Sequence, residues 1–166
     1  FFFPGYGDYK AYNSARNSVT LCDMQFVSWV LSQFSMIDQM KDALDDLDLV
    51  TLDHRIGAVH WRITEPDGRM VVLEVVGGVP QFYENKLGVI TNAPGFQWHM
   101  TNLNNYVNLM PGSAPNNTIA PGITLQPLGH GSGMLGLPGD YTSPSRFVRA
   151  TFFQTTAPVG PDGFST

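Results

Sequence analysis

Charged side chains are scarce in this sequence. Asp, Glu, Lys and Arg make up 14% of the 166 residues, whereas soluble domains average about a quarter. The net charge is −5, and Lys and Arg form no run, so we expect no nucleic-acid partner. With so little charge on the surface, we expect part of it to be covered by another chain or by another segment of the same protein.

Long apolar runs are also missing. The candidate membrane segment at residues 24–36 is interrupted by polar residues, namely Gln25, Ser28, Ser32, Gln33 and Ser35. We therefore expect no transmembrane helix and no membrane partner. No basic segment followed by an apolar run indicates a signal peptide, and the sequence leaves the compartment, cytoplasmic or periplasmic, open.

Cysteine occurs once, at Cys22, which excludes an internal disulfide and a cysteine-rich zinc site. The residue lies near the start of a predicted helix, where a thiol is either activated or buried as a structural residue. The four histidines, His54, His60, His99 and His130, show no i, i+4 pairing and no carboxylate at ligand spacing. This spacing argues against zinc.

Both ends of the sequence have the character of an interior segment. Phe1-Phe2-Phe3 would be an exposed apolar liability at a free terminus, and residues 157–163 have only loop composition. We expect the chain to be a piece of a longer protein.

Helices flank a block of strands in the predicted secondary structure. Apolar spacing predicts a helix from Leu21 with Thr20 as its N-cap, then a second helix that opens with a capping box at 35–38 and ends near 45–46. Turn residues separate four predicted strands, at 58–64, 69–76, 79–83 and 87–90. The short turns imply an antiparallel sheet. Two more helices are predicted, at 94–107 and 145–155. The pattern indicates one α+β domain over residues 1–166.

Residues 111–138 carry Gly and Pro at high density without lasting periodicity, which predicts a long loop. A loop of that length is usually functional or packs on a partner. Within it, residues 131–136 match G-x-G-x-x-G. No strand precedes and no helix follows this match, so it does not indicate a dinucleotide site.

Two polar residues occupy unusual places. Asn92 stands where an apolar strand enters a turn, so its amide would lie on a rigid rim and could donate to a developing oxyanion, or else bond its own backbone. Arg146 stands at a predicted helix start, where positive charge opposes the helix dipole. Either it pairs with a carboxylate such as Asp140 or it serves a site.

Six short motifs, in order and at compatible spacing, resemble the choloylglycine hydrolase family, which comprises bile salt hydrolases and penicillin V acylases. They read YEN at 83–85, GVITNAP at 88–94, WH at 98–99, TNLNNY at 101–106, GLPGD at 136–140 and SRF at 145–147. The segments FPGY at 3–6 and WVL at 29–31, together with Phe34, also fit. The resemblance covers nearly the whole chain.

The resemblance implies part of an αββα N-terminal-nucleophile hydrolase sandwich, in which antiparallel sheets are flanked by helices. A cysteine at the start of the mature chain would attack a linear amide, with its own α-amino group as the base. Asn92 matches the family's oxyanion-hole asparagine, and Arg146 matches an active-site arginine. Phe2 aligns with a position that is often Asn or Tyr, where the backbone N–H could still donate. Residues 111–138 resemble an assembly loop, which implies a homotetramer, and no metal or organic cofactor is implied.

The nucleophilic cysteine itself has no match in this chain, because Cys22 falls in the middle of the family pattern. We therefore expect a small-molecule amide substrate, such as a conjugated bile salt, penicillin V or another N-acyl compound, only where the nucleophile is supplied from outside residues 1–166. The alternatives are a non-catalytic interaction module that reuses the fold, and a thiol hydrolase built on Cys22 and a histidine.

Overall fold

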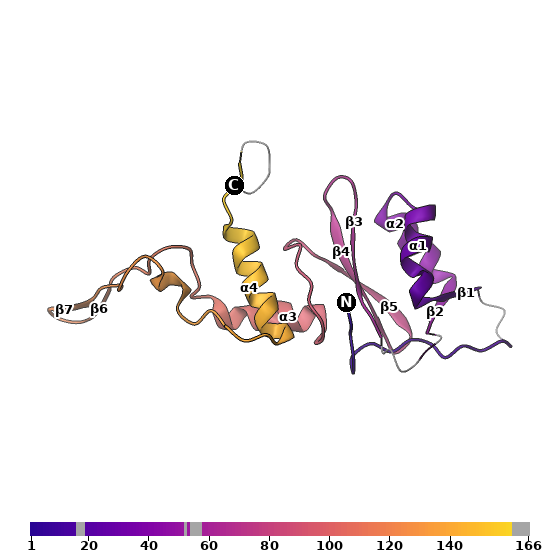
Figure 1. Ribbon diagram of the computed structural model, residues 1–166, viewed down its shortest axis with the longest axis horizontal. Helices are drawn as coiled ribbons and strands as arrows, with labels where there is room; N and C mark the ends of the chain where they lie inside the picture. The colour runs from indigo at the N-terminus through magenta and orange to yellow at the C-terminus, as the bar shows by residue number, and fades with distance from the viewer. Residues whose placement is uncertain (16–18, 52, 54–57, 161–166) are drawn as a thin grey trace. The chain divides into compact units, whose positions relative to one another are not determined.

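The computed structural model describes residues 1–15, 19–51, 53 and 58–160 (Figure 1). The chain forms two compact units, of which the first is Phe1–His99 and the second begins at Met100. The prediction that residues 1–166 form a single domain stays a prediction. Among the described residues, no helix has both the length and the apolar character needed to cross a membrane.

The centre of the first unit is a three-stranded antiparallel sheet. Strands β3 (Trp61–Thr64), β4 (Met70–Val76) and β5 (Val79–Glu84) lie in the order β3-β4-β5, as the hairpin pattern predicted. Val76 pairs with Val79 across Gly77-Gly78, and both glycines have positive φ, which suits the twist of a two-residue hairpin turn.

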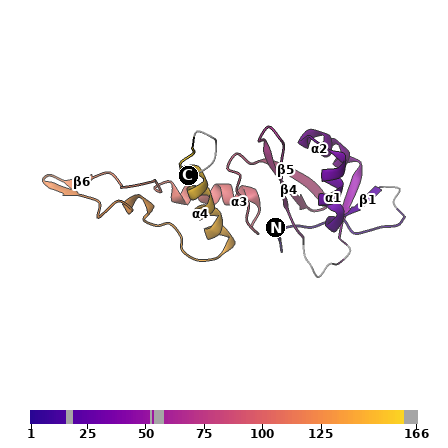
Figure 2. The same cartoon turned by 45° about the horizontal axis from the view of Figure 1, so that its top comes forward.

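Helices α1 (Asp23–Gln33) and α2 (Ile37–Asp45) pack on one face of this sheet, beside β4 and β5 in both views (Figures 1 and 2). The core between them contains side chains from α1, α2, strand β2 (Leu47–Val50) and every second residue of β4: Phe26, Val30, Ile37, Met40, Leu44, Leu49, Val71, Leu73 and Val75. Side chains alternate along a strand, so the buried Val72 and Glu74 face the other side of the sheet.

The start of α1 differs from the prediction. Residues Val19–Cys22 form strand β1, which pairs in parallel with β2 (Leu47–Val50), and the helix begins only at Asp23. Thr20 is therefore not an N-cap. Local apolar spacing could not reveal this, because the partner strand lies beyond both helices in sequence.

The predicted capping box at 35–38 is wrong as well. The first N–H of α2, that of Ile37, donates to the Glu65 carboxylate at 3.2 Å, while Ser35 contacts Gln39 rather than Asp38. A carboxylate from the end of β3 thus replaces the local cap.

Residues 87–90 are irregular, so the fourth predicted strand is wrong. Side chains take the place of a strand partner here: the Asn85 amide donates to the Val89 carbonyl at 3.0 Å, and Arg62 donates to the Gly88 carbonyl. Val89 and Ile90 are nevertheless buried, which accounts for their apolar character.

Helix α3 (Phe96–Asn102) continues into a 3₁₀ turn, η1 (Leu103–Tyr106), close to the predicted helix at 94–107. In the second unit, α4 (Ser143–Thr156) confirms the predicted helix and begins two residues earlier. The predicted loop at 111–138 contains a short hairpin of β6 (Asn117–Ala120) and β7 (Ile123–Leu125), which lies away from α4, and a 3₁₀ turn, η2 (Ser132–Met134) (Figure 2).

Candidate functional site

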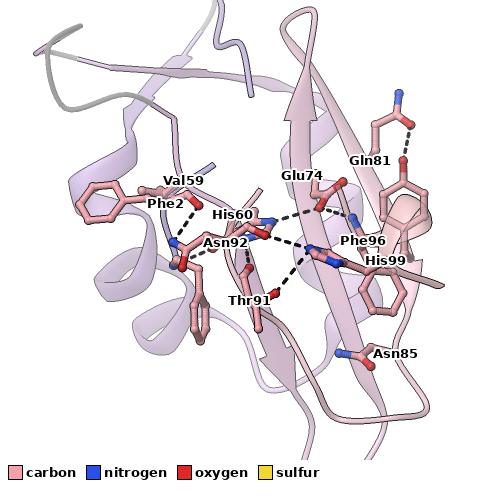
Figure 3. Close-up of polar contacts among 12 residues, drawn as sticks. Phe2, Val59, His60, Glu74, Gln81, Asn85, Thr91, Asn92, Phe96 and His99 are labelled. Carbon is pink, nitrogen blue, oxygen red and sulfur yellow. Dashed lines mark hydrogen bonds and ion pairs between the residues drawn. The ribbon is translucent and has the colours of Figure 1, made fainter. Parts of the chain in front are cut away.

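Asn92 lies in the turn between the irregular segment 87–91 and α3. Its side-chain Nδ2 donates to the backbone carbonyl of Phe2 at 3.0 Å (Figure 3). A cis peptide bond between Ala93 and Pro94 follows it. The structure therefore brings together two of the three predicted site residues, although 90 positions separate them in sequence.

Phe2 belongs to a short extended segment that pairs with Val59. The hydrogen bonds of this pairing are made by its neighbours, from His60 N to the Phe1 carbonyl at 3.0 Å and from Phe3 N to the Ala58 carbonyl at 2.8 Å. In an antiparallel pair this pattern directs the N–H and C=O of Phe2 toward the opposite edge. Asn92 lies at that edge, so the Phe2 N–H and the Asn92 amide share one side of the strand.

Tyr9 holds the partner strand in place. Its hydroxyl donates to the Val59 carbonyl at 3.1 Å and accepts from the Val59 N–H at 3.0 Å. Burial raises the pKa of Tyr9 to about 12, so the phenol keeps the proton that it donates.

Two buried histidines contact the backbone on either side of the Asn92 Cα. His60 Nε2 lies 2.7 Å from the Thr91 carbonyl oxygen, and His99 Nε2 lies 3.0 Å from the Asn92 carbonyl oxygen (Figure 3). Each histidine is 1% exposed. Thr91 Oγ1 is a more distant neighbour of His99 Nε2, at 3.4 Å.

Glu74 joins this cluster from the centre of β4. Its Oε1 lies 3.0 Å from His60 Nδ1 and accepts the Phe96 N–H, the first of α3, at 2.8 Å. Glu74 is not among the site residues predicted from the sequence. A signal was present, because a carboxylate in the middle of the otherwise apolar strand MVVLEVV would be buried on either face and must find partners.

Arg146 lies in the second unit, in the first turn of α4, and its Nε donates to the Tyr141 carbonyl at 3.1 Å. Asp140, the pairing partner considered from sequence, accepts from the Ser145 hydroxyl at 2.6 Å and from the Thr142 hydroxyl and N–H at 2.6 and 2.9 Å. The Ser145 bond, followed by the Thr142 bonds, lowers the pKa of Asp140 to about 2. Asp140 thus binds Thr142 and the Ser145 hydroxyl as an anion at the start of α4.

Cys22 is buried at the junction of β1 and α1, and its Sγ lies 3.1 Å from Asp23 Oδ1. His60 and His99 belong to the cluster around Asn92. His54 lies outside the described residues. The hypothesis of a thiol hydrolase built on Cys22 gains no support from these positions.

The roles of Phe2, Asn92 and Arg146 stay predictions, but the chemistry of the first two is compatible with one task. An amide side chain and a backbone N–H at one strand edge are a pair of neutral donors suited to a developing negative charge. Glu74 bonds to His60, and all three side chains bond to the backbone around Asn92 or at the start of α3, so they hold the site together rather than open onto it.

Known proteins match this chain over nearly its whole length. The family model of linear amide C–N hydrolases, choloylglycine hydrolase family, matches residues 1–160. The bile salt hydrolase/transferase of Lactiplantibacillus plantarum is 36% identical over 154 residues, which cover 90% of this chain and 46% of that protein. The bile salt hydrolase/transferase of Clostridium perfringens is 33% identical over 156 residues, which cover 92% and 47%. The chain thus spans about half the length of these relatives.

Solved structures agree. A variant of the conjugated bile acid hydrolase from Clostridium perfringens has a TM-score of 0.78 at 33% identity, over 93% of this chain and 48% of that one. Penicillin V acylase from Agrobacterium tumefaciens has a TM-score of 0.66 at 20% identity, over 92% and 40%, and supports the fold alone. These likenesses confirm the α+β class and the partial N-terminal-nucleophile hydrolase fold. The chain belongs to the choloylglycine hydrolase family of linear amide C–N hydrolases.

Proposed function

We propose that this chain supplies the oxyanion-binding part of an enzyme that hydrolyses linear amides, and that a cysteine outside residues 1–166 is the nucleophile. The observation that carries the proposal is the convergence of the Asn92 amide and the Phe2 backbone on one strand edge, 3.0 Å from each other. Membership of the choloylglycine hydrolase family supplies the reaction class.

The proposed reaction has two steps. The cysteine thiolate attacks the amide carbonyl, the C–S bond forms, and the carbonyl oxygen takes up the negative charge. When the C–N bond breaks, the amine leaves with the proton that the cysteine's α-amino group took from the thiol. Water then cleaves the thioester, which releases the acid and restores the thiol.

The residues of this chain stabilise the negative charge that develops on the substrate's carbonyl oxygen. One N–H of the Asn92 amide is directed to the Phe2 carbonyl, which fixes the amide plane. The other N–H and the backbone N–H of Phe2 are the donors that we assign to the oxyanion, and such a donor is worth about 3 kcal/mol in the transition state. Arg146 supports the thiolate electrostatically.

The substrate class that fits is an N-acyl amide: a conjugated bile salt, penicillin V or a related compound. The exposed apolar side chains of the β6–β7 segment, namely Ile119, Ile123, Leu125 and Leu128, support an assembly role for residues 111–138. We propose a homotetramer in the intact enzyme, which the mass of the purified protein in solution tests.

The first experiment is to read the coding sequence that precedes the Phe1 codon, and to assay the complete gene product on a glycine-conjugated bile salt and on penicillin V. We expect a cysteine that becomes the first residue of the mature chain, and turnover that iodoacetamide abolishes in both the wild type and Cys22→Ala. Turnover that disappears in Cys22→Ala would favour the thiol hydrolase built on Cys22. A folded product without turnover on any N-acyl amide favours the non-catalytic interaction module.

A further inference from the structure

The two peptide groups that flank the Asn92 Cα are each held by a buried imidazole. The Thr91 carbonyl contacts His60 Nε2 at 2.7 Å, and the Asn92 carbonyl contacts His99 Nε2 at 3.0 Å. A carbonyl oxygen only accepts hydrogen bonds, so both Nε2 atoms carry a proton and donate it. This assignment follows from the partners and fixes the orientation of both rings.

These two bonds determine where the Asn92 side chain points. Each peptide group is planar, so fixing its carbonyl fixes the whole plane. The two planes that meet at the Asn92 Cα set its φ and ψ, and therefore the direction of its Cβ. The bond from Nδ2 to the Phe2 carbonyl then sets the rotation of the amide itself.

His60 is in turn locked by its own neighbours. Its Nδ1 lies 3.0 Å from Glu74 Oε1, and the Phe3 ring stacks on the imidazole with centroids 4.6 Å apart and planes 9° from parallel. One proton lies between Nδ1 and Oε1, so the pair is net neutral whichever atom holds it. Glu74 is 3% exposed, and removing the hydrogen-bond partner of a buried polar group destabilises the fold.

We infer that His60, held by Glu74, and His99 are positioning residues that aim the Asn92 amide at the oxyanion. This inference rests on the proposed function, because it assigns no chemistry to the histidines themselves. They act through the backbone of Asn92 and touch no reacting atom. The orientation of the catalytic amide is thereby built into the buried side of β4, opposite the face that α1 and α2 cover.

Glu74→Gln tests the inference because it changes the proton count without changing the shape. With a glutamine oxygen facing both the Phe96 N–H and His60 Nδ1, a neutral imidazole must keep its proton on Nδ1. Nε2 then has no proton to donate to Thr91. We expect kcat of the complete gene product to fall roughly tenfold to a hundredfold, as misplacement of a catalytic group by up to about 1 Å does. KM should change by less than about threefold.

Glu65→Gln is the matched control. Glu65 is also a buried carboxylate of the first unit, 5% exposed, and also accepts the first N–H of a helix, that of Ile37 in α2. Its carboxylate bonds to the Ile37 N–H and to the Arg69 guanidinium, neither of which belongs to the Asn92 turn. We expect a similar loss of thermal stability from Glu65→Gln, with kcat unchanged.

His60→Gln and His60→Asn form a second pair of variants. They test whether His60 positions Asn92 even if Glu74→Gln does not fold. The glutamine amide nitrogen takes about the place of Nε2 and can donate to Thr91, whereas the asparagine nitrogen takes the place of Nδ1 and faces Glu74. Both variants lose the ring and one hydrogen bond. We expect His60→Gln to retain at least about fivefold more kcat than His60→Asn, since only it keeps the Thr91 carbonyl in place.

Asn92→Ala, measured beside these variants, separates the two levels of the proposal. Low kcat in Asn92→Ala together with wild-type kcat in Glu74→Gln, or equal kcat in the two His60 variants, overturns the positioning role and leaves the proposed function standing. Wild-type kcat in Asn92→Ala, or a wild-type product without turnover, overturns the proposed function and the positioning role with it.

Discussion

The turn that carries Asn92 and the helix start that carries Arg146 are ordered by different kinds of contact. Asn92 and its neighbour Thr91 are held by Phe2 and His60, which lie 90 and 31 residues away in sequence. Arg146 donates to Tyr141, only 5 residues away. Among the described contacts, those of the Asn92 turn therefore need the first unit to be folded, whereas the bond from Arg146 to Tyr141 needs only a short stretch of chain. Substitutions far from Asn92 in sequence should therefore reach it.

The largest effect should come from Asn92→Ala. Removal of one oxyanion donor costs about 3 kcal/mol in the transition state, so we expect kcat of the complete gene product to fall by ~10²-fold or more. Asn92 is half-buried, and the bond from its amide to the Phe2 carbonyl is worth about 1 kcal/mol, so the melting temperature should fall by only a few degrees. Steady-state kinetics and circular dichroism check both parts.

Asn105→Ala is the control for Asn92→Ala, because it removes the same amide from an exposed position where the side chain bonds Asn102. Its kcat should equal that of the wild type. Near-wild-type turnover in folded Asn92→Ala protein would remove the oxyanion assignment.

Arg146→Gln should have the next largest effect. In the proposed role, a unit charge about 10 Å from the thiolate is worth about 1–2 kcal/mol at an effective dielectric constant of about 20, so we expect kcat to fall on the order of tenfold. Arg146→Lys keeps the charge, so its kcat should fall less than that of Arg146→Gln.

Arg149→Gln provides the comparison for Arg146→Gln. Arg149 lies one turn later on α4 and donates to the carbonyl of Pro138 at 2.8 Å, so its loss should lower the melting temperature more than kcat. Equal losses of kcat in Arg146→Gln and Arg149→Gln would mean that catalysis depends on the conformation of the segment before α4, and not on the Arg146 charge.

The same difference between local and distant contacts explains which parts of the fold the sequence predicted. The hairpin around Gly77-Gly78 and the helix at Ser143–Thr156 were predictable, because a turn and an apolar spacing are written in neighbouring residues. The pairing of β1 with β2 was not, since Val19 meets Leu47 across two intervening helices. The β6–β7 hairpin was missed because its strands are short and almost wholly exposed, so they show no alternation.

The candidate site divides in the same way. The position of Asn92 in a turn was predictable, because an apolar segment that ends in an amide is visible locally, while its role stays a prediction. The contact between His60 and Glu74 was not, because its two members are 14 residues apart on different segments and each has a simpler explanation alone.

Gly95→Ala should have a smaller effect that is transmitted to Asn92 from nearby. A Cβ at this position would lie 3.0 Å from Glu74 Oε2, and Glu74 cannot move freely because it is bonded to His60 and to Phe96. We expect kcat to fall a few-fold and the free energy of unfolding to fall by about 1 kcal/mol. Kinetics and urea denaturation measure the two effects.

Gly131→Ala is the matched substitution in the second unit, where a Cβ meets nothing within 4 Å. This substitution should leave kcat and the free energy of unfolding unchanged. If Gly95→Ala also leaves kcat unchanged, the path from Glu74 to Asn92 does not transmit a small displacement.

The smallest effect should appear only in acid, at Asp140. The pKa of this carboxyl is about 2 in the folded chain, below its ordinary value of 3.8, because Ser145 and then Thr142 donate to the anion. A depressed pKa means that the anion stabilises the fold above about pH 4, and that this stabilisation is lost as the pH falls from about 4 to about 2. The melting temperature of Asp140→Asn should therefore lie below that of the wild type at neutral pH and approach it toward pH 2.

Ser145→Ala removes the strongest donor to Asp140. The pKa of Asp140 should be higher in this variant, so the acid-induced loss of stability should be complete at a higher pH than in the wild type. A constant difference in melting temperature between the wild type and Asp140→Asn across this range would show that ionisation of Asp140 contributes nothing to stability. The Arg146 segment would then depend, as the Asn92 turn does, on contacts from farther along the chain.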